Sequence, residues 1–516
     1  MSLNLTVMLD ESAKVRPQKP ALVLGEEKVT YAALREASMR FAAALSSLGI
    51  EPGDRVAIMV PNVPQFAIAY YGILRAGAVV VPLNVLLQGP EVAYHLEDSG
   101  TKALVAWDGF LEAAGRGYEE ASGCEHLIVA GEKEVASEGA LGFRGLLEQH
   151  PPEFETVQTM PDDTAVIIYT SGTTGRPKGA ELSHFNLFYN AVCNADKLVQ
   201  TSEEDAGIAA LPLFHIFGQT AVLNTFVYSG NTITMIPRFE PEAVLGAIER
   251  DRITIFTGVP TMYQYLLHHP AADAHDTSSL RLGISGGASM PVEVLRRFEE
   301  KFGITILEGY GLSETSPVVC FNRSAEERKV GSIGLPIWGI EARVVDEDDR
   351  EVPRGETGEL VVRGHAIMKG YYGRPKETAE AMRGGWFHTG DLARMDEDGY
   401  IFIVDRKKDM IVRGGYNVYP REVEEAIYEH PAVAEVAVVG VPHEELGEEV
   451  VAVVVPKEGA RVEEEEIIAF ARERVARYKY PRRVVFVEEL PKNATGKILK
   501  RELGPERLGP EVRGRR

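Results

Sequence analysis

Short apolar runs alternate with amphipathic stretches along most of the chain. The runs at residues 55–60 and 165–169 are almost wholly apolar, which is the pattern of strands buried on both faces. Residues 291–302 instead carry apolar side chains at helical spacing, between a proline at the start and Gly303 as a stop signal. This alternation predicts an α/β fold with mostly parallel sheets.

The charge balance changes near residue 406. The 516 residues carry a net charge of −22, yet residues 406–516 hold 21 basic and 21 acidic residues, so the first 405 carry the whole excess. We therefore expect a large N-terminal domain of mixed and parallel sheets with helices over residues 1–405, and a small C-terminal α/β domain over 410–516. The elements expected in the small domain are strands at 436–439 and 450–455 and helices starting at Pro420 and spanning 463–476.

The composition excludes several classes of protein. A net charge of −22 argues against general attraction to nucleic acid or to anionic lipid. The three cysteines are too far apart for metal-ligand spacing, and an odd, sparse count does not suggest a disulfide scaffold. Met1 to Pro17 has no secretory pattern, and the most apolar stretch, 72–87, is interrupted by Arg75 and Pro82. We expect a cytoplasmic protein with no nucleic-acid partner and no integral membrane span; the sequence leaves a homodimer open.

The end of the chain is locally basic. Residues 472–516 contain 14 basic and 6 acidic residues. Beside a large acidic domain, such a face suits an anionic substrate held between the two domains. On charge alone, a solvated basic surface is the favoured interpretation.

A loop rich in glycine and hydroxyls follows the strand expected at 165–169. It reads Thr170-Ser-Gly-Thr-Thr-Gly-Arg-Pro-Lys-Gly179. Glycines let successive backbone N–H groups turn toward an anion, hydroxyls donate to phosphate oxygens, and Lys178 adds a cation. It is not a Walker loop, because a proline precedes the lysine and a glycine follows it. The pattern predicts a phosphate-binding loop rather than a flexible surface turn.

The segment from Tyr169 to Gly179 closely resembles the phosphate-loop signature of the acyl-adenylate-forming (AMP-binding) superfamily, which includes acyl-CoA synthetases, peptide-synthetase adenylation domains and beetle luciferases. The resemblance covers nearly the whole chain, because further signatures follow in order. The segments that resemble these further family signatures are residues 211–218, 285–288, 308–315, 386–391, 401–406 and 490–500. The resemblance implies a two-step ligase with ATP and CoA as cosubstrates and Mg²⁺ as cofactor.

The resemblance also implies which residues bind the nucleotide. Glu314 and Thr170 would hold Mg²⁺, and Lys178 would hold the phosphates. On the residues alone, Glu314 could be a helix N-terminal charge, Asp391 a cap or turn residue, and Arg406 a linker ion pair. The residues implied for ATP or AMP are Thr170, Ser171, Gly172, Thr173, Thr174, Gly175, Gly286, Gly287, Ala288, Glu308, Gly309, Tyr310, Gly311, Thr315, Asp391 and Arg406.

His215 is implied to lie near the substrate carboxylate and the α-phosphate, where its imidazole could donate a hydrogen bond. A histidine between two phenylalanines is, taken alone, more often a core residue. Peptide-synthetase domains that activate amino acids usually carry an aspartate here, so a histidine favours an acid without an amine.

The acid itself is indicated by the segment 217–230, which is apolar and uncharged. It suits an alkyl channel, although an ordinary buried helix fits equally well. The acyl-pocket residues expected are Phe214, Gly218 and Ala221. The chain is similar to bacterial fatty-acyl-CoA synthetases, so we expect activation of a medium- or long-chain fatty acid. Alternatives are an aryl-CoA ligase, an acyl-AMP ligase that loads a carrier protein, and an inactive nucleotide-binding protein.

The C-terminal signature Pro491-Lys-Asn-Ala-Thr-Gly-Lys497 implies that Lys497, with His215 and Lys178, is catalytic in the first step. The family's hinge residue maps to Lys408, within a hinge at 406–409, so the resemblance implies that the small C-terminal domain is mobile. The CoA pantetheine tunnel maps to Arg413, Gly414 and Gly415. Without the family, these would be an exposed lysine, a solvated charge run and a simple turn.

Overall fold

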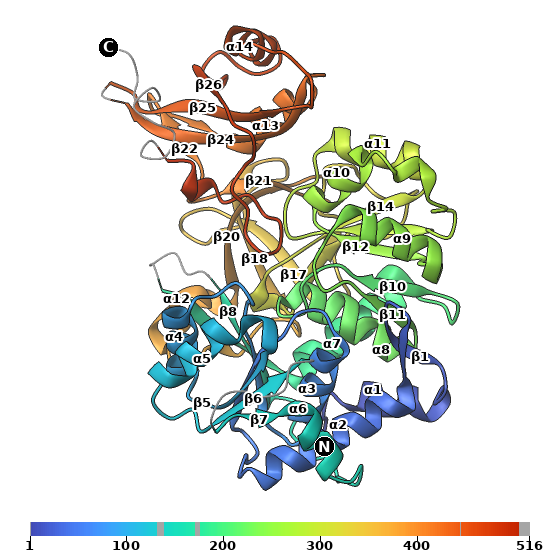
Figure 1. The fold of residues 1–516 in the computed structure, drawn as a ribbon. Coiled ribbons are helices and arrows are strands. Elements are labelled where there is room, and N and C mark those ends of the chain that lie inside the picture. The colour runs from blue at the N-terminus through green and yellow to red at the C-terminus, as the bar shows by residue number, and fades with distance from the viewer. Residues whose placement is uncertain (1, 132–138, 171–175, 444, 505–516) are drawn as a thin grey trace.

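The computed structural model describes residues 2–131, 139–170, 176–443 and 445–504. Figure 1 shows a large domain that carries the N-terminus and a smaller domain, built from the last part of the chain, that lies at one end of it. The predicted division into a large α/β domain and a small C-terminal one is confirmed. No helix in the described ranges is both long enough and apolar enough to cross a membrane.

The first sheet of the large domain has eight strands, parallel from β8 through β7 and antiparallel at β9 and β19. The strands predicted at 55–60 and 165–169 are β3 and β8. In spatial order the strands are β19 (Gly370–Tyr371), β9 (Lys178–Ser183), β8 (Thr164–Thr170), β4 (Val79–Pro82), β3 (Arg55–Met59), β5 (Thr101–Trp107), β6 (His126–Ala130) and β7 (Leu141–Gly142).

The second sheet has nine strands, parallel from β14 through β1. The register places Gly258 beside Ser285 and Ser285 beside Glu308, so three strand ends meet at one edge. In spatial order the strands are β16 (Leu335–Pro336), β15 (Val318–Phe321), β14 (Thr305–Gly311), β13 (Leu282–Ser285), β12 (Ile255–Gly258), β10 (Ala206–Ala209), β11 (Thr232–Met235), β1 (Pro20–Leu24) and β2 (Glu27–Thr30).

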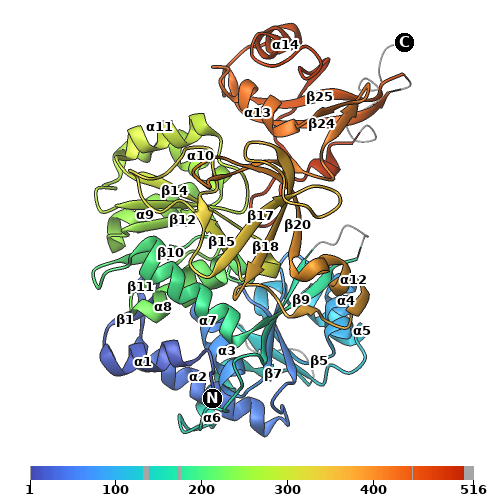
Figure 2. The same ribbon diagram turned by 180° about the vertical axis from the view of Figure 1, so that it is seen from behind.

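Helices fill the space between these sheets and cover their outer faces (Figures 1 and 2). The helix predicted at 291–302 is α11; Pro291 precedes it, and Gly303 ends it with a φ of 68°. Between the sheets lie α1 (Val7–Val15), α2 (Tyr31–Ser47), α3 (Pro64–Arg75), α7 (His184–Cys193) and α8 (Thr225–Ser229). On the outer faces lie α4 (Gly89–Ser99) and α5 (Leu111–Glu120) on the first sheet, and α9 (Pro241–Asp251), α10 (Pro260–His268) and α11 (Val292–Phe302) on the second. The short helices α6 (Phe143–Gln149) and α12 (Pro375–Ala381) complete the large domain.

A third, antiparallel sheet leads the chain out of the large domain. Its strands are β17 (Ile340–Val345), β18 (Thr357–Gly364), β20 (Phe387–Met395) and β21 (Ile401–Arg406). Asp391 on β20 is the cross-strand partner of Arg406, the last residue of β21. This sheet therefore brings a predicted ribose ligand next to the start of the predicted hinge.

Within the residues that the structure describes, the small domain is a five-stranded sheet with the α-helices α13 and α14. The strands predicted at 436–439 and 450–455 lie within β24 and β25, and α13 begins at Pro420 as expected. The helix predicted at 463–476 is shorter: α14 ends at Arg472, and the Arg474 N–H donates to the Ala471 carbonyl three residues back, which is the tighter bond of a turn. The elements are β22 (Ile411–Arg413), β23 (Tyr416–Val418), α13 (Pro420–Tyr428), β24 (Val433–His443), β25 (Gly447–Pro456), α14 (Glu464–Arg472) and β26 (Arg483–Phe486).

Candidate active site

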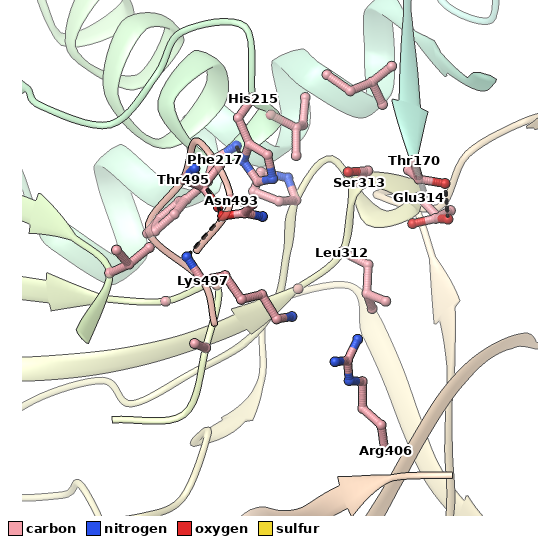
Figure 3. A pocket seen from close by; sticks show the side chains of 18 of the residues that line it. Thr170, His215, Phe217, Leu312, Ser313, Glu314, Arg406, Asn493, Thr495 and Lys497 are labelled. Atoms are coloured by element: carbon pink, nitrogen blue, oxygen red, sulfur yellow. Dashed lines mark hydrogen bonds between the residues drawn. The ribbon is translucent and has the colours of Figure 1, made fainter. Parts of the chain in front are cut away.

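A cavity of about 1690 Å³ is lined by residues of both domains. The large domain contributes the ends of β8, β13 and β14, together with parts of β20 and β21. The small domain contributes α13 and the segment 493–501. The predicted motifs, spread over more than 300 residues of sequence, thus meet around one space (Figure 3).

One end of this cavity combines hydroxyls, a carboxylate and a cation. Thr170, at the end of β8, donates to Glu314 Oε1 at 3.3 Å, and the Tyr371 hydroxyl donates to the same oxygen at 2.9 Å. Lys178 begins β9 directly across from Thr170, and its ammonium lies 4.8 Å from the centre of the Tyr371 ring. The structure therefore brings the predicted phosphate and metal residues together. The predicted contacts of Ser171, Gly172, Thr173, Thr174 and Gly175 lie outside the described residues.

The chemistry of this end fits Mg²⁺. Glu314 is buried, and both of its carboxylate hydrogen bonds described above use Oε1. A carboxylate beside a hydroxyl is a hard oxygen donor set, and Mg²⁺ commonly takes only one or two carboxylates and completes its shell with phosphate and water. Glu314 and Thr170 are the residues that could hold it.

The predicted adenosine side of the cavity consists of two glycine-rich strand ends. The residues predicted there that line it are Gly286, Gly287, Ala288, Glu308, Gly309, Tyr310 and Gly311. The Tyr310 hydroxyl donates to Asp391 Oδ2, so the predicted adenine and ribose residues are linked to each other. Burial raises the pKa of Asp391, and burial raises the pKa of Glu308 to about 7.

Thr315 is a correction to the predicted site. Its side chain is fully buried, accepts from the Leu312 N–H at 2.8 Å and donates to the carbonyls of Leu312 and Pro317. It is not among the residues that line the cavity. The hydroxyl is used to hold the tight turn after β14, not to reach a phosphate.

His215 lies in the turn that leads into a wide π-helix over Phe217–Asn224. The Phe217 backbone N–H donates to His215 Nδ1 at 3.2 Å, so the neutral ring carries its proton on Nε2. Burial, with a smaller effect from the Lys497 ammonium, lowers the pKa of His215 to about 4. At neutral pH this side chain is therefore an uncharged hydrogen-bond donor that lines the cavity.

Lys497 enters the cavity from the small domain on a short hairpin. The Asn493 side-chain oxygen accepts from the backbone N–H groups of Thr495 and Lys497 at 3.0 and 2.9 Å, and the Asn493 N–H donates to the Lys497 carbonyl at 2.9 Å. Figure 3 shows the Lys497 side chain extending from this loop into the cavity. Burial, with a smaller effect from the positive charge of Arg406, lowers the pKa of Lys497 to about 8.

Arg406 and Lys408 both line the cavity where the chain passes between the domains. Arg406 forms an ion pair with Asp409 at 2.8 Å. This is the linker ion pair that the residues alone suggested, as an alternative to a contact with the nucleotide. The Lys407 N–H donates to the Gly390 carbonyl at 3.0 Å, next to Asp391. The start of the predicted hinge is thus bonded to the loop that carries the predicted ribose ligand.

The predicted acyl-pocket residues divide into two groups. Phe214 and Ala221 line the cavity. Gly218 does not, because its backbone packs against the Pro212 carbonyl, where an added Cβ would lie 2.5 Å from the oxygen. Its role is therefore corrected from pocket lining to the close packing of the turn that holds His215.

The predicted CoA residues lie outside the cavity in this orientation of the domains. Gly414 and Gly415, with φ of 57° and 82°, form the two-residue turn between β22 and β23. Arg413 pairs with Glu449 at 2.5 Å within the small domain. A contact between these residues and CoA stays a prediction.

Two residues that sequence reasoning missed complete the site. Tyr371 belongs to β19, and its hydroxyl holds Glu314. Asn493 organises the loop that carries Lys497. The asparagine could have been found, because an asparagine in a short Asn-Ala-Thr-Gly run predicts a turn closed by its own side chain. Tyr371 had no local signal, since only pairing of β19 with β9 brings it to the cavity.

Comparison with known proteins agrees with this arrangement. A model of the AMP-binding enzyme family matches residues 9–372, and a model of the AMP-binding enzyme C-terminal domain matches residues 422–497. The long-chain-fatty-acid–CoA ligase of Bacillus subtilis (strain 168) is 39% identical over 97% of this chain and 94% of its own. The feruloyl-CoA synthase of Amycolatopsis sp. is 40% identical over 95% of this chain and 96% of its own.

Among solved structures, the anthranilate CoA ligase AuaEII in complex with anthranoyl-AMP superposes with a TM-score of 0.92. It is 31% identical, and the match covers 97% of this chain and 96% of that one. The relatives thus cover both aliphatic and aromatic acids.

Proposed function

The chain belongs to the AMP-binding enzyme family and is an acyl- or aryl-CoA ligase of it, and on this premise we propose that it activates a medium- or long-chain fatty acid. ATP and CoA are the cosubstrates. The acid would be converted to an acyl-adenylate and then to the acyl-CoA thioester.

The observation that carries this proposal is a set of apolar side chains among the residues that line the cavity. Phe214, Phe217, Ala221, Leu312 and Val318 all line the cavity, and none carries a charge. Uncharged apolar side chains suit a hydrocarbon chain. None of these five side chains would offer a counter-charge to an amine or a second carboxylate on the substrate.

In the first step, a substrate carboxylate oxygen attacks the α-phosphorus of ATP, and the bond to the β-phosphate oxygen breaks, which releases pyrophosphate. Lys497 contributes a positive charge where negative charge builds up, and His215 Nε2–H donates a hydrogen bond to an oxygen of the reacting groups. Neither residue forms a covalent bond, so catalysis is positioning and charge stabilisation. When bound, Mg²⁺ would neutralise phosphate charge, with Glu314 and Thr170 as its protein ligands.

In the second step, the CoA thiol attacks the acyl carbon, loses its proton, and AMP leaves. We propose that rotation about Lys408 withdraws Lys497 and brings Gly415 to the acyl carbon. Lys408→Pro, which fixes φ near −65°, should preserve adenylation and slow thioester formation, while the control Lys408→Ala should leave both steps close to wild type. Equal rates for the two variants would remove Lys408 as the hinge.

The experiment that tests the proposed function measures pyrophosphate and AMP release with Mg·ATP, with and without CoA. The acids are a series from acetate to palmitate, with benzoate and ferulate. AMP turnover that depends on CoA and peaks with a medium or long chain supports the proposal. A single burst of pyrophosphate that CoA does not affect would point instead to a carrier-protein thiol as acceptor, and no turnover with any acid would overturn the assignment.

A second candidate is an aryl-CoA ligase. It is favoured by the feruloyl-CoA synthase and anthranilate CoA ligase among the relatives, both similar over at least 95% of this chain. Two phenylalanines on the cavity wall, Phe214 and Phe217, are also suited to pack against an aromatic ring. A higher kcat/KM for benzoate or ferulate than for any alkyl acid would select this candidate.

A further inference from the structure

The small domain contacts one face of α10 through side chains spaced as i, i+3 and i+4. Thr261 Oγ1 donates to the Gly496 carbonyl at 3.0 Å, and the Gln264 side chain donates to the Ala434 carbonyl. The third contact is the Tyr265 hydroxyl, which accepts from the Lys492 ammonium at 2.7 Å. Residues at this spacing lie side by side on a helix, so α10 forms one docking face for the small domain.

Lys492 has partners in both domains. Its ammonium lies 2.8 Å from the Glu435 carboxylate, which belongs to the small domain and is 5% exposed. It also lies 5.0 Å from the centre of the Tyr265 ring, close enough for a cation–π contact. The ion pair with Glu435 moves with the small domain, whereas the contact with Tyr265 exists only while that domain rests on α10.

Lys492 and Lys497 are on the two sides of the same short hairpin. Lys492 pairs with Ile498 in an antiparallel bridge, and Asn493 closes the turn between them through the bonds described above. A hairpin this short is fixed in direction by its own hydrogen bonds. Holding Lys492 on α10 therefore also fixes where the Lys497 ammonium projects into the cavity.

We propose that Tyr265 is a positioning residue for the adenylation step: it holds the Lys492 side of the hairpin and so presents Lys497 to the α-phosphate. Tyr265 is 42% exposed and is not among the cavity-lining residues, so it acts through Lys492 and not on the substrate. The inference rests on the proposed function, since it assigns Tyr265 to the first of the two proposed steps only.

The test separates the two half-reactions in three variants. Tyr265→Phe keeps the ring but removes the hydroxyl acceptor, and Tyr265→Ala removes both. Tyr118→Phe is the matched control, because its hydroxyl donates to the Glu125 carbonyl within the large domain, outside the cavity. Single-turnover pyrophosphate release reports adenylation, and thioester formation from synthetic acyl-adenylate and CoA reports the second step.

We expect Tyr265→Phe to slow adenylation by about 3- to 10-fold, the effect of one hydrogen bond to a charged donor near the surface, and Tyr265→Ala to slow it further. Thioester formation from the acyl-adenylate should stay within about twofold of wild type in both. Equal losses in the two half-reactions, a loss confined to thioester formation, or no change in adenylation would each overturn the inference.

A second measurement does not depend on activity. Hydrogen exchange of the segment 491–499 should be faster in Tyr265→Ala than in wild type and unchanged in Tyr118→Phe. If the wild-type protein activates no acid, the proposed function fails, and the exchange rates still decide whether Tyr265 holds the hairpin. Unchanged exchange in Tyr265→Ala would overturn the positioning role.

Discussion

The two sides of the cavity are held in place by different kinds of structure. On the large-domain side, Thr170 and Ser285 end strands β8 and β13 and Glu308 lies within β14, and each of these strands is paired with a neighbour on both sides. On the small-domain side, Lys497 projects from a hairpin that docks on α10 through a few polar contacts. Burial of apolar strands stabilises the first side, whereas the second is held by a few polar contacts, of which the Lys492–Tyr265 bond is exposed and can be broken at small cost. In the proposed reaction, the nucleotide side would be a fixed platform and the lysine side would be removable.

The largest expected effect comes from deleting the removable side. Lys497→Ala should slow adenylation by about 10²–10³-fold, because one preorganised charge at the reacting phosphate is lost. Thioester formation from preformed acyl-adenylate should stay within about twofold. Lys457→Ala, on the small domain but outside the cavity, is the control. If both half-reactions slowed equally in Lys497→Ala, the distinction between the two sides would fail.

A change on the fixed platform should instead affect both half-reactions. Asp391→Asn weakens a buried acceptor that also bonds the Tyr310 hydroxyl, and we expect kcat/KM for ATP to fall by about 10- to 100-fold. Thioester formation from acyl-adenylate should fall as well, because the proposed contact between Asp391 and the ribose would be made in both steps. Asp396→Asn, which alters the Lys329 ion pair outside the cavity, should change neither rate. A loss limited to adenylation would contradict a role for Asp391 in both steps.

The pH dependence provides a subtler comparison. The pKa of Lys497 is lowered to about 8, so the lysine is charged below that pH and neutral above it. Adenylation kcat/KM should therefore fall by about tenfold per unit as the pH rises above about 8, and thioester formation should not share this decrease. With a pKa near 4, His215 should contribute no change between about pH 5 and 8. A common alkaline loss in both steps would contradict the assignment to Lys497.

The smallest effect is expected from a single neutral contact. Thr261→Val removes the hydroxyl that donates to the Gly496 carbonyl, and adenylation should slow by about two- to fivefold. Thr232→Val, which removes a similar bond to the Pro20 carbonyl far from the domain boundary, is the matched control. Rates measured by pyrophosphate release should distinguish the two variants, and identical rates would mean that Thr261 does not contribute to docking.

Local patterns in the sequence were sufficient to predict several of the strands and helices around the site. The runs that became β3 and β8, the helix α11 with its flanking Pro291 and Gly303, and the division into two domains followed from periodicity and charge alone. In each case the signal is contiguous in sequence and does not depend on a distant partner. The glycine-rich ends of β8, β13 and β14 were likewise recognisable before their neighbours were known.

Local sequence patterns did not predict which residues of a motif face the cavity. Gly218 and Thr315 belong to motifs that line the cavity, but both are turned into the protein by the packing of their turns. Tyr371 and Tyr265 are brought to their roles by a strand pairing and a domain contact that join residues about 190 and 230 positions apart in sequence. Motif membership thus predicted which segments meet, and only the three-dimensional packing decided which side chains face the cavity.

The register that pairs Asp391 with Arg406 has a consequence for the lifetime of the intermediate. An acyl-adenylate is a mixed anhydride, and water competes with a thiol for it. Because Asp391 belongs to the third sheet of the large domain, a rotation that begins beyond Arg406 would leave the proposed contact of Asp391 with the intermediate unchanged. In the proposed reaction, the acyl-adenylate would stay bound while the small domain rotates to replace Lys497 by Gly415 at the cavity. Loss of the acyl-adenylate to hydrolysis would therefore be limited during the rotation.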